Sequence, residues 1–336
     1  MKRFLSITVA ALVAVVTIGS SFGGVASAQS RGLGITPRRD LVIQPGKSVT
    51  DQVTVNNLNN SEPLNLSLEI VDFGAQDETG TPALELDPEA DQTPWSLKPF
   101  IKAPTSLTVA PGESEVVKFT VTIPADQGAG SYYSAIRYSA EGGDGGQVGL
   151  SASGATLVFT TVPGKTKESL ITKKFGAYES KGTTNGSYRS LFVSKQPSEM
   201  AFTLKNQGNV AEQPAGSILV KNMFGKQSLV IKDANPKSSL ALIGQDRRFQ
   251  VCMVEQKSDT DVTCKPASLT PGRYTASLSL FYGINGNQTQ EIAATASFWY
   301  LPVWFLVVVG VVLLAIVIAG YMLYRRFTGG RGFKKR

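Results

Sequence analysis

Histidine is absent from this chain of 336 residues, and only two cysteines are present. Without histidine, the chain can form neither a Ser-His-Asp nor a Cys-His nucleophile system. It can also form no zinc or iron site with imidazole ligands, and two cysteines are too few for a site of four thiolates. These absences exclude most hydrolases and metalloenzymes, so we expect a protein without enzymatic activity.

Acidic residues are missing from both ends of the chain. Residues 1–28 contain two basic residues and residues 301–336 contain six, whereas neither segment contains aspartate or glutamate. The formal net charge of +7 therefore comes from the ends, and residues 29–300 are nearly neutral. A nearly neutral body lacks the basic surface that nucleic-acid binding needs, so we expect no nucleic-acid partner.

The first 28 residues have the pattern of a secretory signal peptide. Two basic residues precede an apolar stretch over residues 4–18, and the small residues Ala26-Ser27-Ala28 match the site that signal peptidase recognises. We predict a signal peptide over 1–28, with cleavage between Ala28 and Gln29. An uncleaved anchor is the alternative.

Residues 301–324 have the length and composition of a membrane-spanning helix. The stretch 303–319 contains no charged side chain, and about 20 helical residues cross the hydrocarbon layer of a bilayer. Tryptophan and tyrosine residues border this stretch on both sides, as in an aromatic belt. The tail 325–336 carries six positive charges, so the positive-inside rule places it in the cytoplasm and the body outside the cell. No Leu-Pro-x-Thr-Gly sorting motif precedes the helix, so we expect a retained single-pass anchor in the cell membrane.

The body between these segments has the texture of a β protein. Short runs alternate apolar and polar residues, and Pro-Gly or Asn/Gly clusters separate the runs. Clear examples are residues 64–70 and residues 117–123, where every second residue is apolar. Seven or so such strands in the first half predict an antiparallel sandwich with one buried face per sheet.

The second half repeats parts of the first. Gly272-Arg-Tyr274 echoes Gly130-x-Tyr132, and Phe202-x-Leu204-x-Asn206 resembles Val53-x-Val55-x-Asn57. We therefore predict an all-β body of two tandem Ig-like antiparallel β-sandwiches, followed by one C-terminal transmembrane α-helix. The predicted sandwiches cover residues 29–165 and 166–298.

Cys252 and Cys264 flank a polar segment on the predicted oxidising side of the membrane. A disulfide between them would close a small loop and contribute roughly 2–3 kcal/mol in the loop-entropy model. The C-x-x-C spacing of redox-active pairs is absent, which leaves a redox role as the weaker alternative.

An acidic segment covers residues 72–91. Carboxylates are the ligands that Ca²⁺ takes, but the EF-hand order is missing. We expect a solvated loop and no cofactor, with calcium binding as the alternative. Paired carboxylates also hydrolyse glycosides, so a carboxylate glycosidase is a remote alternative. The acidic residues are Asp72, Asp77, Glu78, Glu85, Asp87, Glu89 and Asp91.

Aromatic side chains offer a surface for sugar rings. Alternation along residues 130–138 places Tyr132 and Ile136 on the core face and Tyr133 on the opposite face. We therefore predict that Tyr133 is exposed, and we name Tyr133 and Trp95 as candidate ligand contacts. The alternative is that such aromatic residues fill the core or its rim.

The order of motifs in the first half resembles the N-terminal domain of the WxL-interacting protein family. Members are bacterial surface proteins with a signal peptide, two sandwich domains and a C-terminal membrane helix. The resemblance implies a first domain that binds peptidoglycan. The matching motifs, within about residues 33–165, are Ile43-Gln-Pro45-Gly46-Lys-Ser, Val-x-Val-x-Asn57, Trp95, Val109-Ala-Pro111-Gly112-Glu-Ser, Ile123-Pro124-Ala-Asp, Gly130-x-Tyr132 and Val162-Pro163-Gly164.

The second half departs from that family and looks like a sandwich domain found in many bacterial membrane-anchored surface proteins. The resemblance therefore does not carry over the wall-bound WxL partner that the family's second domain engages. Pilus chaperones share the general sandwich plan, but they are soluble, and the predicted anchor argues against that class.

These features together predict a non-enzymatic protein of the cell surface, anchored in the membrane, that binds cell-wall glycan or a wall-associated protein. A tethered body meets wall polymer at high effective concentration, so weak binding would suffice. The alternative is a structural spacer or protein-docking module that uses open sheet edges and has no affinity for glycan.

Overall fold

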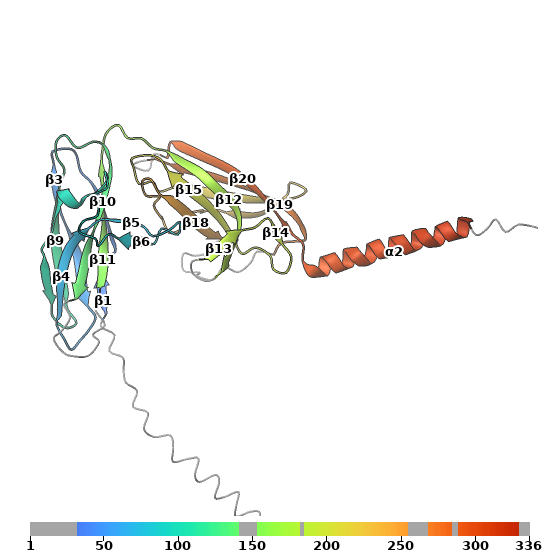
Figure 1. Cartoon of the computed structure of the whole chain (residues 1–336), viewed down its shortest axis with the longest axis horizontal. Coiled ribbons are helices and arrows are strands. Elements are labelled where there is room, and N and C mark those ends of the chain that lie inside the picture. Colours follow the sequence, from blue (N-terminus) through green and yellow to red (C-terminus); the bar gives the residue numbers. More distant parts are fainter. Residues whose placement is uncertain (1–31, 141–152, 182–184, 255–267, 284–287, 329–336) are drawn as a thin grey trace, which may run out of the picture.

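The computed structural model describes residues 32–140, 153–181, 185–254, 268–283 and 288–328. Two β-sandwiches are followed by one long helix (Figure 1). The predicted signal peptide with its cleavage site at Ala28 and Gln29, Cys264, and tail residues 329–336 lie outside the described residues.

The first sandwich is built from eleven strands and one short 3-10 helix. These elements are β1 (Leu33–Ile35), β2 (Arg38–Val42), β3 (Ser48–Asn57), β4 (Leu64–Val71), β5 (Phe73–Ala75), β6 (Pro82–Leu84), η1 (Lys98–Phe100), β7 (Ile101–Lys102), β8 (Ser106–Val109), β9 (Ser114–Thr122), β10 (Gly130–Ala140) and β11 (Ser153–Val162). One sheet has the order β1-β3-β9-β7 and the other β2-β11-β10-β4-β8, while β5 and β6 pair with each other as a separate hairpin.

The second sandwich is built from nine strands, and a helix follows it. These elements are β12 (Leu170–Lys181), β13 (Asn185–Tyr188), β14 (Leu191–Phe192), β15 (Glu199–Asn206), β16 (Ala215–Asn222), β17 (Gln227–Ile231), β18 (Asp246–Cys252), β19 (Gly272–Tyr282), β20 (Gln290–Tyr300) and the helix α2 (Val303–Thr328). The two sheets have the orders β13-β12-β15-β18 and β14-β20-β19-β16-β17.

The two sandwiches share one topology. The order β2-β11-β10-β4-β8 matches β14-β20-β19-β16-β17 strand for strand, and β3 beside β9 matches β15 beside β18. The repeated Gly-x-Tyr motif falls on matching strands, with Tyr132 in β10 and Tyr274 in β19. Each tyrosine hydroxyl donates a hydrogen bond to the backbone carbonyl four residues earlier, just before its strand begins. The sandwiches are not wholly antiparallel, because β2 pairs in parallel with β11, and β14 with β20.

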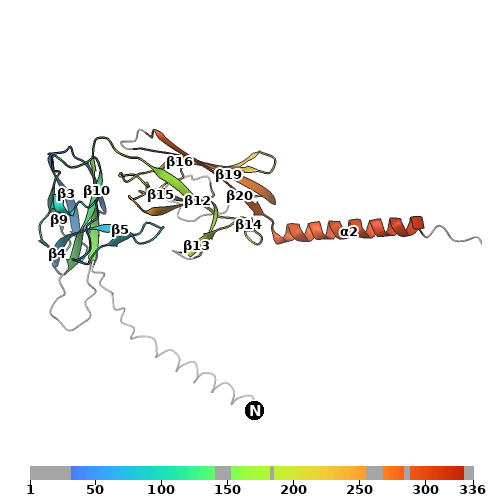
Figure 2. The same ribbon diagram turned by 45° about the horizontal axis from the view of Figure 1, so that its top comes forward.

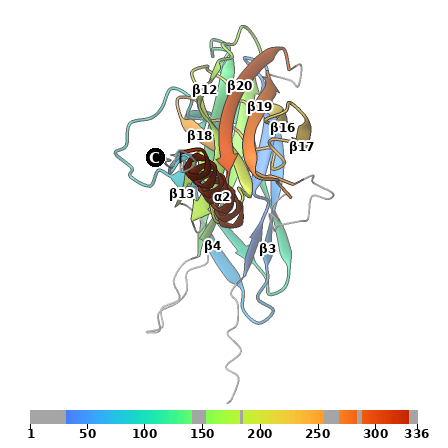
Figure 3. The same ribbon diagram turned by 90° about the vertical axis from the view of Figure 1, so that its right-hand side faces the viewer.

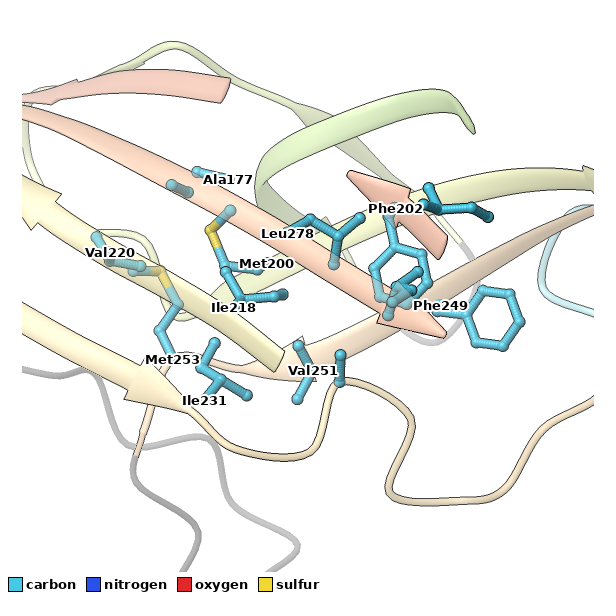
Figure 4. Packing of buried hydrophobic residues seen from close by; sticks show 14 of the residues in the cluster. Ala177, Met200, Phe202, Ile218, Val220, Ile231, Phe249, Val251, Met253 and Leu278 are labelled. Atoms are coloured by element: carbon cyan, nitrogen blue, oxygen red, sulfur yellow. The ribbon is translucent and has the colours of Figure 1, made fainter. Parts of the chain in front are cut away.

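Alternating residues build the two cores. In β9, Val117, Phe119 and Val121 are buried while Lys118 between them is exposed, as the sequence predicts. The second core is formed by strands of both sheets, including Met200 and Phe202 of β15 and Ile218 of β16 (Figure 4). Each core holds its two sheets together by burying apolar surface.

The helix α2 leaves the second sandwich almost directly, beside β20 (Figure 3). Only Leu301 and Pro302 separate β20 from α2, and the Leu301 N–H donates to the Phe192 carbonyl over 2.9 Å. None of the 26 residues of α2 is buried, and their length and composition make the helix a candidate membrane span.

Candidate functional site

The two sandwiches are joined by a third apolar cluster, which draws residues from both. Phe73, Tyr133 and Phe159 of the first sandwich pack beside Ile243 of the second. The rings of Phe73 and Tyr133 have centroids 5.2 Å apart, and those of Phe73 and Phe159 have centroids 5.6 Å apart. A buried aromatic cluster of this kind holds two domains in one arrangement.

The prediction that Tyr133 is exposed is wrong. Its side chain is only 1 % exposed, because the second face of β10 is covered by the second sandwich rather than by solvent. Burial raises the pKa of the Tyr133 hydroxyl, which has no hydrogen-bond partner among the described residues. Tyr132 and Ile136 lie in the first core, as predicted.

Trp95 lies against the same cluster and is partly buried. Its backbone carbonyl accepts a hydrogen bond of 3.0 Å from the Tyr133 N–H, and its ring lies near Gly244 of the second sandwich. The structure thus brings Trp95 and Tyr133 together, but as part of a domain junction rather than as an open aromatic platform.

Part of the acidic segment forms an arm between the sandwiches, so the expectation of a solvated loop holds only for its later residues. The hairpin of β5 and β6 reaches the second sandwich (Figure 1), where the Ala75 N–H donates to the Gln245 side chain over 2.8 Å. Glu78 lies 3.5 Å from the Arg248 guanidinium. Two hydrogen bonds from Thr79 lower the pKa of Asp77, and the charges of Arg248 and Arg247 lower it further.

The later acidic residues of the segment, Glu85, Asp87, Glu89 and Asp91, are exposed. Asp72 accepts hydrogen bonds of 2.7 Å from both Ser96 and Ser134. Within the described ranges, no group of three or more acidic or cysteine side chains is arranged to hold a metal ion.

The loop after β15 forms hydrogen bonds to the first sandwich and to the segment between β11 and β12, which joins the two sandwiches. The Asn209 side chain donates to the Ala129 carbonyl over 2.9 Å, and its carbonyl oxygen accepts from the Lys167 N–H over 2.7 Å. The Asn209 backbone oxygen accepts from Ser131 over 2.9 Å. A Cβ on Gly208 would lie 2.3 Å from the Lys167 carbonyl, so only glycine fits there.

A pocket of about 290 Å³ opens beside this junction, between the two sandwiches. The first sandwich contributes mainly polar groups, including Arg38 and Asp40 of β2. The second contributes the loop before β16. The lining residues are Arg38, Asp40, Ser131, Phe159, Thr161, Val210, Ala211, Glu212, Gln213, Ala215, Leu240, Gly283 and Gln288.

Arg38 is held in place at this pocket. Its guanidinium bonds the Asp40 carboxylate at 2.6 Å and lies 4.9 Å from the centre of the Phe159 ring. The ion pair balances the charge of Asp40, while the ring supports the flat guanidinium by a cation–π contact. Asp40 therefore brings no net negative charge to the pocket.

Glu212 is the buried carboxylate of the pocket. Two backbone hydrogen bonds with Ala241 fix its position, at 2.8 and 3.1 Å. The residue is 1 % exposed, and its Oε1 has no hydrogen-bond partner among the described residues. Burial raises the pKa of Glu212 to about 7, the charge of Glu168 adds to the rise, and a hydrogen bond from the Gly283 backbone opposes it.

This arrangement can accept a hydrogen-bond donor. A buried carboxylate oxygen without a partner has lost its hydration and has gained nothing in return. A hydroxyl, amide N–H or ammonium group placed in the pocket would restore that lost interaction. Exposed Gln213 and Gln288 would supply neutral donors and acceptors at its rim.

Cys252 is the last residue of β18. Its predicted disulfide partner, Cys264, lies outside the described residues. The disulfide therefore stays a prediction.

The comparisons with known proteins concern the fold. No protein-family model matches the chain, and no curated protein matches it. Among solved structures, the class 5 fimbriae chaperone CfaA is 12 % identical with a TM-score of 0.36, covering 79 % of this chain and 98 % of its own.

Two further solved structures show the range of such matches. The Escherichia coli chaperone DraB is 11 % identical with a TM-score of 0.34, covering 78 % of this chain and 96 % of its own. A family 123 glycoside hydrolase from Clostridium perfringens is 14 % identical with a TM-score of 0.26, covering 39 % of this chain and 27 % of its own. The all-β sandwich class of this chain follows from its own strands and sheets, and similarity at this level bears on neither ligand nor activity.

Sequence reasoning missed both Glu212 and Arg38. A single glutamate in a polar loop carries no pattern that separates it from a solvated one. The nearest signal was the repeated Asn motif at Asn57 and Asn206, because the side chains of both residues bind the backbone of the loop that follows. That likeness marks the two loops as equivalent and draws attention to the one that lies between the sandwiches.

Proposed function

We propose that this chain is a non-enzymatic protein of the cell surface, anchored in the membrane by α2, which binds cell-wall glycan or a wall-associated protein with its β-sandwich body. In this proposal the N-terminal body is outside the cell and the basic tail is in the cytoplasm. Peptidoglycan is the favoured ligand, and the interdomain pocket is where it binds.

The observation that carries the proposal is the buried Glu212 carboxylate in the pocket. Glycan strands and their peptides offer hydroxyl, amide N–H and ammonium groups, which are the donors that Oε1 of Glu212 lacks. A pocket of about 290 Å³ is near the lower limit for small-ligand sites and fits a single sugar ring or an amino-acid side chain better than a long chain.

The test is co-sedimentation of the full chain, held in lipid nanodiscs, with protein-stripped peptidoglycan sacculi. We expect saturable pelleting that empty nanodiscs do not show. Glu212→Gln should weaken it about tenfold or more, because a hydrogen bond to a charged acceptor contributes roughly 1.5–3 kcal/mol. Glu115→Gln, which removes the same charge from an exposed position of β9, serves as the matched control.

Absence of pelleting would reject direct glycan binding. Equal pelleting of the wild-type chain and Glu212→Gln would keep glycan binding but move it away from the pocket. Loss of pelleting in Glu115→Gln as well would show that surface charge alone drives the association.

A protein partner is the second candidate, and an open sheet edge favours it. The two residues of β7 pair only with Thr120 and Val121, so no described strand covers β9 from Ser114 to Phe119 on the side away from β3. Such an edge can accept a partner's strand. A photo-crosslinking residue in place of exposed Val116 should then join one wall protein in living cells, whereas the same residue at Leu58 should not.

A further inference from the structure

One end of the second sandwich carries exposed apolar side chains at the level where α2 begins. We call Leu191, Val193, Met223, Phe224 and Trp299 the apolar collar. The described part of this sandwich has seven exposed large apolar side chains, and these five are among them. Phe224 is 86 % exposed, the largest exposed fraction among the large apolar side chains in the described part of this sandwich.

Strand register places the collar at one end. Leu191 lies opposite Trp299, and Gly272 lies opposite Tyr300, the last residue before the link to α2. Asn222 lies opposite Tyr274, so the turn that follows Asn222 meets the same end. A Cβ on Gly272 would lie 3.6 Å from the Met223 sulfur, which brings the turn beside the end of the sheet.

The figures agree with the register. In Figures 1 and 2, α2 leaves the second sandwich from the end that carries β14. The collar thus lies at the end of the sandwich from which the helix starts rather than on a distant face.

The link between sandwich and helix is too short to hold them apart. Leu301 and Pro302 span at most about 7 Å when fully extended, and Leu301 is already bonded to Phe192. Phe192 packs on Phe298, with ring centroids 6.1 Å apart, so the link is tied to the core. If α2 crosses a bilayer, the collar must lie at the surface of that bilayer.

The charges beside the collar favour the same occupant. Lys221 and Lys226 flank the turn, and Lys195 follows Val193 by two residues; all three are exposed. Exposed lysines beside apolar side chains are typical of segments that lie in a lipid interface, where the ammonium groups meet headgroup phosphates.

We propose that the apolar collar inserts into the headgroup layer of the leaflet facing the body, with Phe224 as its deepest member, and thereby holds the second sandwich against the membrane. The occupant is the lipid surface itself, in continuity with α2. This inference rests on the membrane anchor of the proposed function and goes beyond it, because an anchor alone would leave the sandwich free to tilt.

The test places the photo-crosslinking residue p-benzoylphenylalanine at position 224 of the full chain, in vesicles of phosphatidylcholine with phosphatidylglycerol. Because Phe224 is almost fully exposed, the fold tolerates this replacement. We expect phospholipid adducts on irradiation. Phe281→p-benzoylphenylalanine is the matched control, since Phe281 is also exposed but pairs with Ala215 at the far end of the sheet.

Two controls separate failure of the collar from failure of the anchor. Vesicle flotation after an alkaline wash reports whether α2 is inserted. A chain that floats but gives no lipid adduct at position 224, or equal adducts at 224 and 281, would overturn the collar and leave the anchor intact. A chain that does not float would reject both. An adduct between two copies of the chain at 224 would assign the collar to self-association instead.

A second measurement tests whether the collar holds the second sandwich against the membrane. Phe224→Ser with Met223→Ser should lengthen the distance from a dye on the first sandwich to labelled headgroups, or broaden its distribution. Val116→Ser with Leu58→Ser, which remove exposed apolar groups from the first sandwich, should leave that distance unchanged. An unchanged distance in the collar variant would contradict its role in holding the domain.

Discussion

At the scale of single residues, Glu212 combines deep burial with an unpartnered carboxylate oxygen. Two hydrogen bonds with Ala241 fix the backbone of Glu212 beside the pocket. Keeping such a group charged opposes folding, and a protein that retains it gains something other than stability. The binding role that we propose for the pocket would account for that.

The stability of the body should depend on pH through Glu212. Its pKa rises from an ordinary value to about 7 on folding. The folded state therefore holds the proton more tightly, and stability falls as pH increases from about 4.5 to 7. Glu212→Gln should remove this dependence and raise the free energy of unfolding at pH 8 by up to about 3 kcal/mol.

Urea denaturation at pH 5 and pH 8 would measure this effect. The variant should match the wild-type chain near pH 5 and exceed it at pH 8. A variant that is less stable than wild type at pH 8 would show that Glu212 has a compensating partner. Glu115→Gln, a substitution at an exposed position of β9, keeps Glu212, so its stability should fall with pH as that of the wild-type chain does.

Gly130 is a second informative residue. It begins β10 with a positive φ of 154°, as Gly272 begins β19 with a φ of 150°. Their surroundings differ. A Cβ on Gly130 would lie 2.7 Å from the Asn209 carbonyl oxygen, whereas a Cβ on Gly272 would lie in ordinary contact with the Met223 side chain, 3.6 Å from its sulfur. The shared glycine thus serves the strand in both sandwiches, and the domain junction in the first alone.

Gly130→Ala should therefore be more destabilising than Gly272→Ala. Backbone strain is similar at the two positions, so the difference isolates the clash at the junction, which we expect to cost about 1–3 kcal/mol. Thermal unfolding of the two variants would measure it. Equal melting temperatures would mean that the Asn209 loop moves aside at no cost in stability.

At the scale of elements, β10 and the hairpin of β5 and β6 decide how the sandwiches meet. One face of β10 packs into the first core, and its other face packs against the second sandwich. The hairpin extends the same contact, with Ala75 bonded to Gln245. These elements join the two sandwiches into one bent body (Figure 1). The pocket lies between the two sandwiches.

Phe73→Ala should loosen this arrangement. The ring contacts both Tyr133 and Phe159, and removing a buried phenylalanine costs about 3–5 kcal/mol. The distance between dyes on the two sandwiches should become more broadly distributed. Phe100→Ala, which removes a ring packed on Tyr132 inside the first sandwich, should lower stability without that broadening. Equal broadening in both variants would contradict a specific role for the aromatic cluster.

At the scale of the whole molecule, the exposed apolar helix is a candidate membrane span, and in our proposal it anchors the body. α2 carries no acidic residue in its first turn and two arginines in its last. In the proposed orientation, its short link to β20 keeps the second sandwich at the bilayer, and the first sandwich lies on the far side of the second (Figure 1). The proposed binding site would then meet its ligand at high effective concentration.

Replacing Val312 and Leu313 of α2 together by arginine should release the chain from membranes. Each arginine at the centre of a spanning helix costs about 2.5–3.5 kcal/mol on insertion scales. Cell fractionation followed by flotation would report the change. Leu58→Arg with Leu86→Arg, at exposed positions of the first sandwich, should leave the membrane fraction unaltered. Retention of the α2 variant in the membrane would show that another segment anchors the chain.

Several features of this protein follow from the sequence by itself. Alternation of apolar and polar residues indicates strands such as β9. Successive side chains of a strand point to opposite faces of the sheet, so a sheet with one buried face has an apolar residue at every second position. Length and apolar composition likewise identify α2 as a candidate membrane span, since a spanning helix must match the thickness and the apolar interior of a bilayer. The paired Gly-x-Tyr motifs indicate a repeated strand because each tyrosine bonds the backbone of its own segment of the chain.

Only the tertiary structure decided what covers the second face of each strand. Alternation places Tyr133 and Tyr132 on opposite faces of β10, but it does not show that another sandwich lies against the Tyr133 face. The same holds for Glu212, which is solvated or buried according to how two distant segments meet. Burial and pKa depend on neighbours that are far away in the chain, and a local pattern carries no information about them.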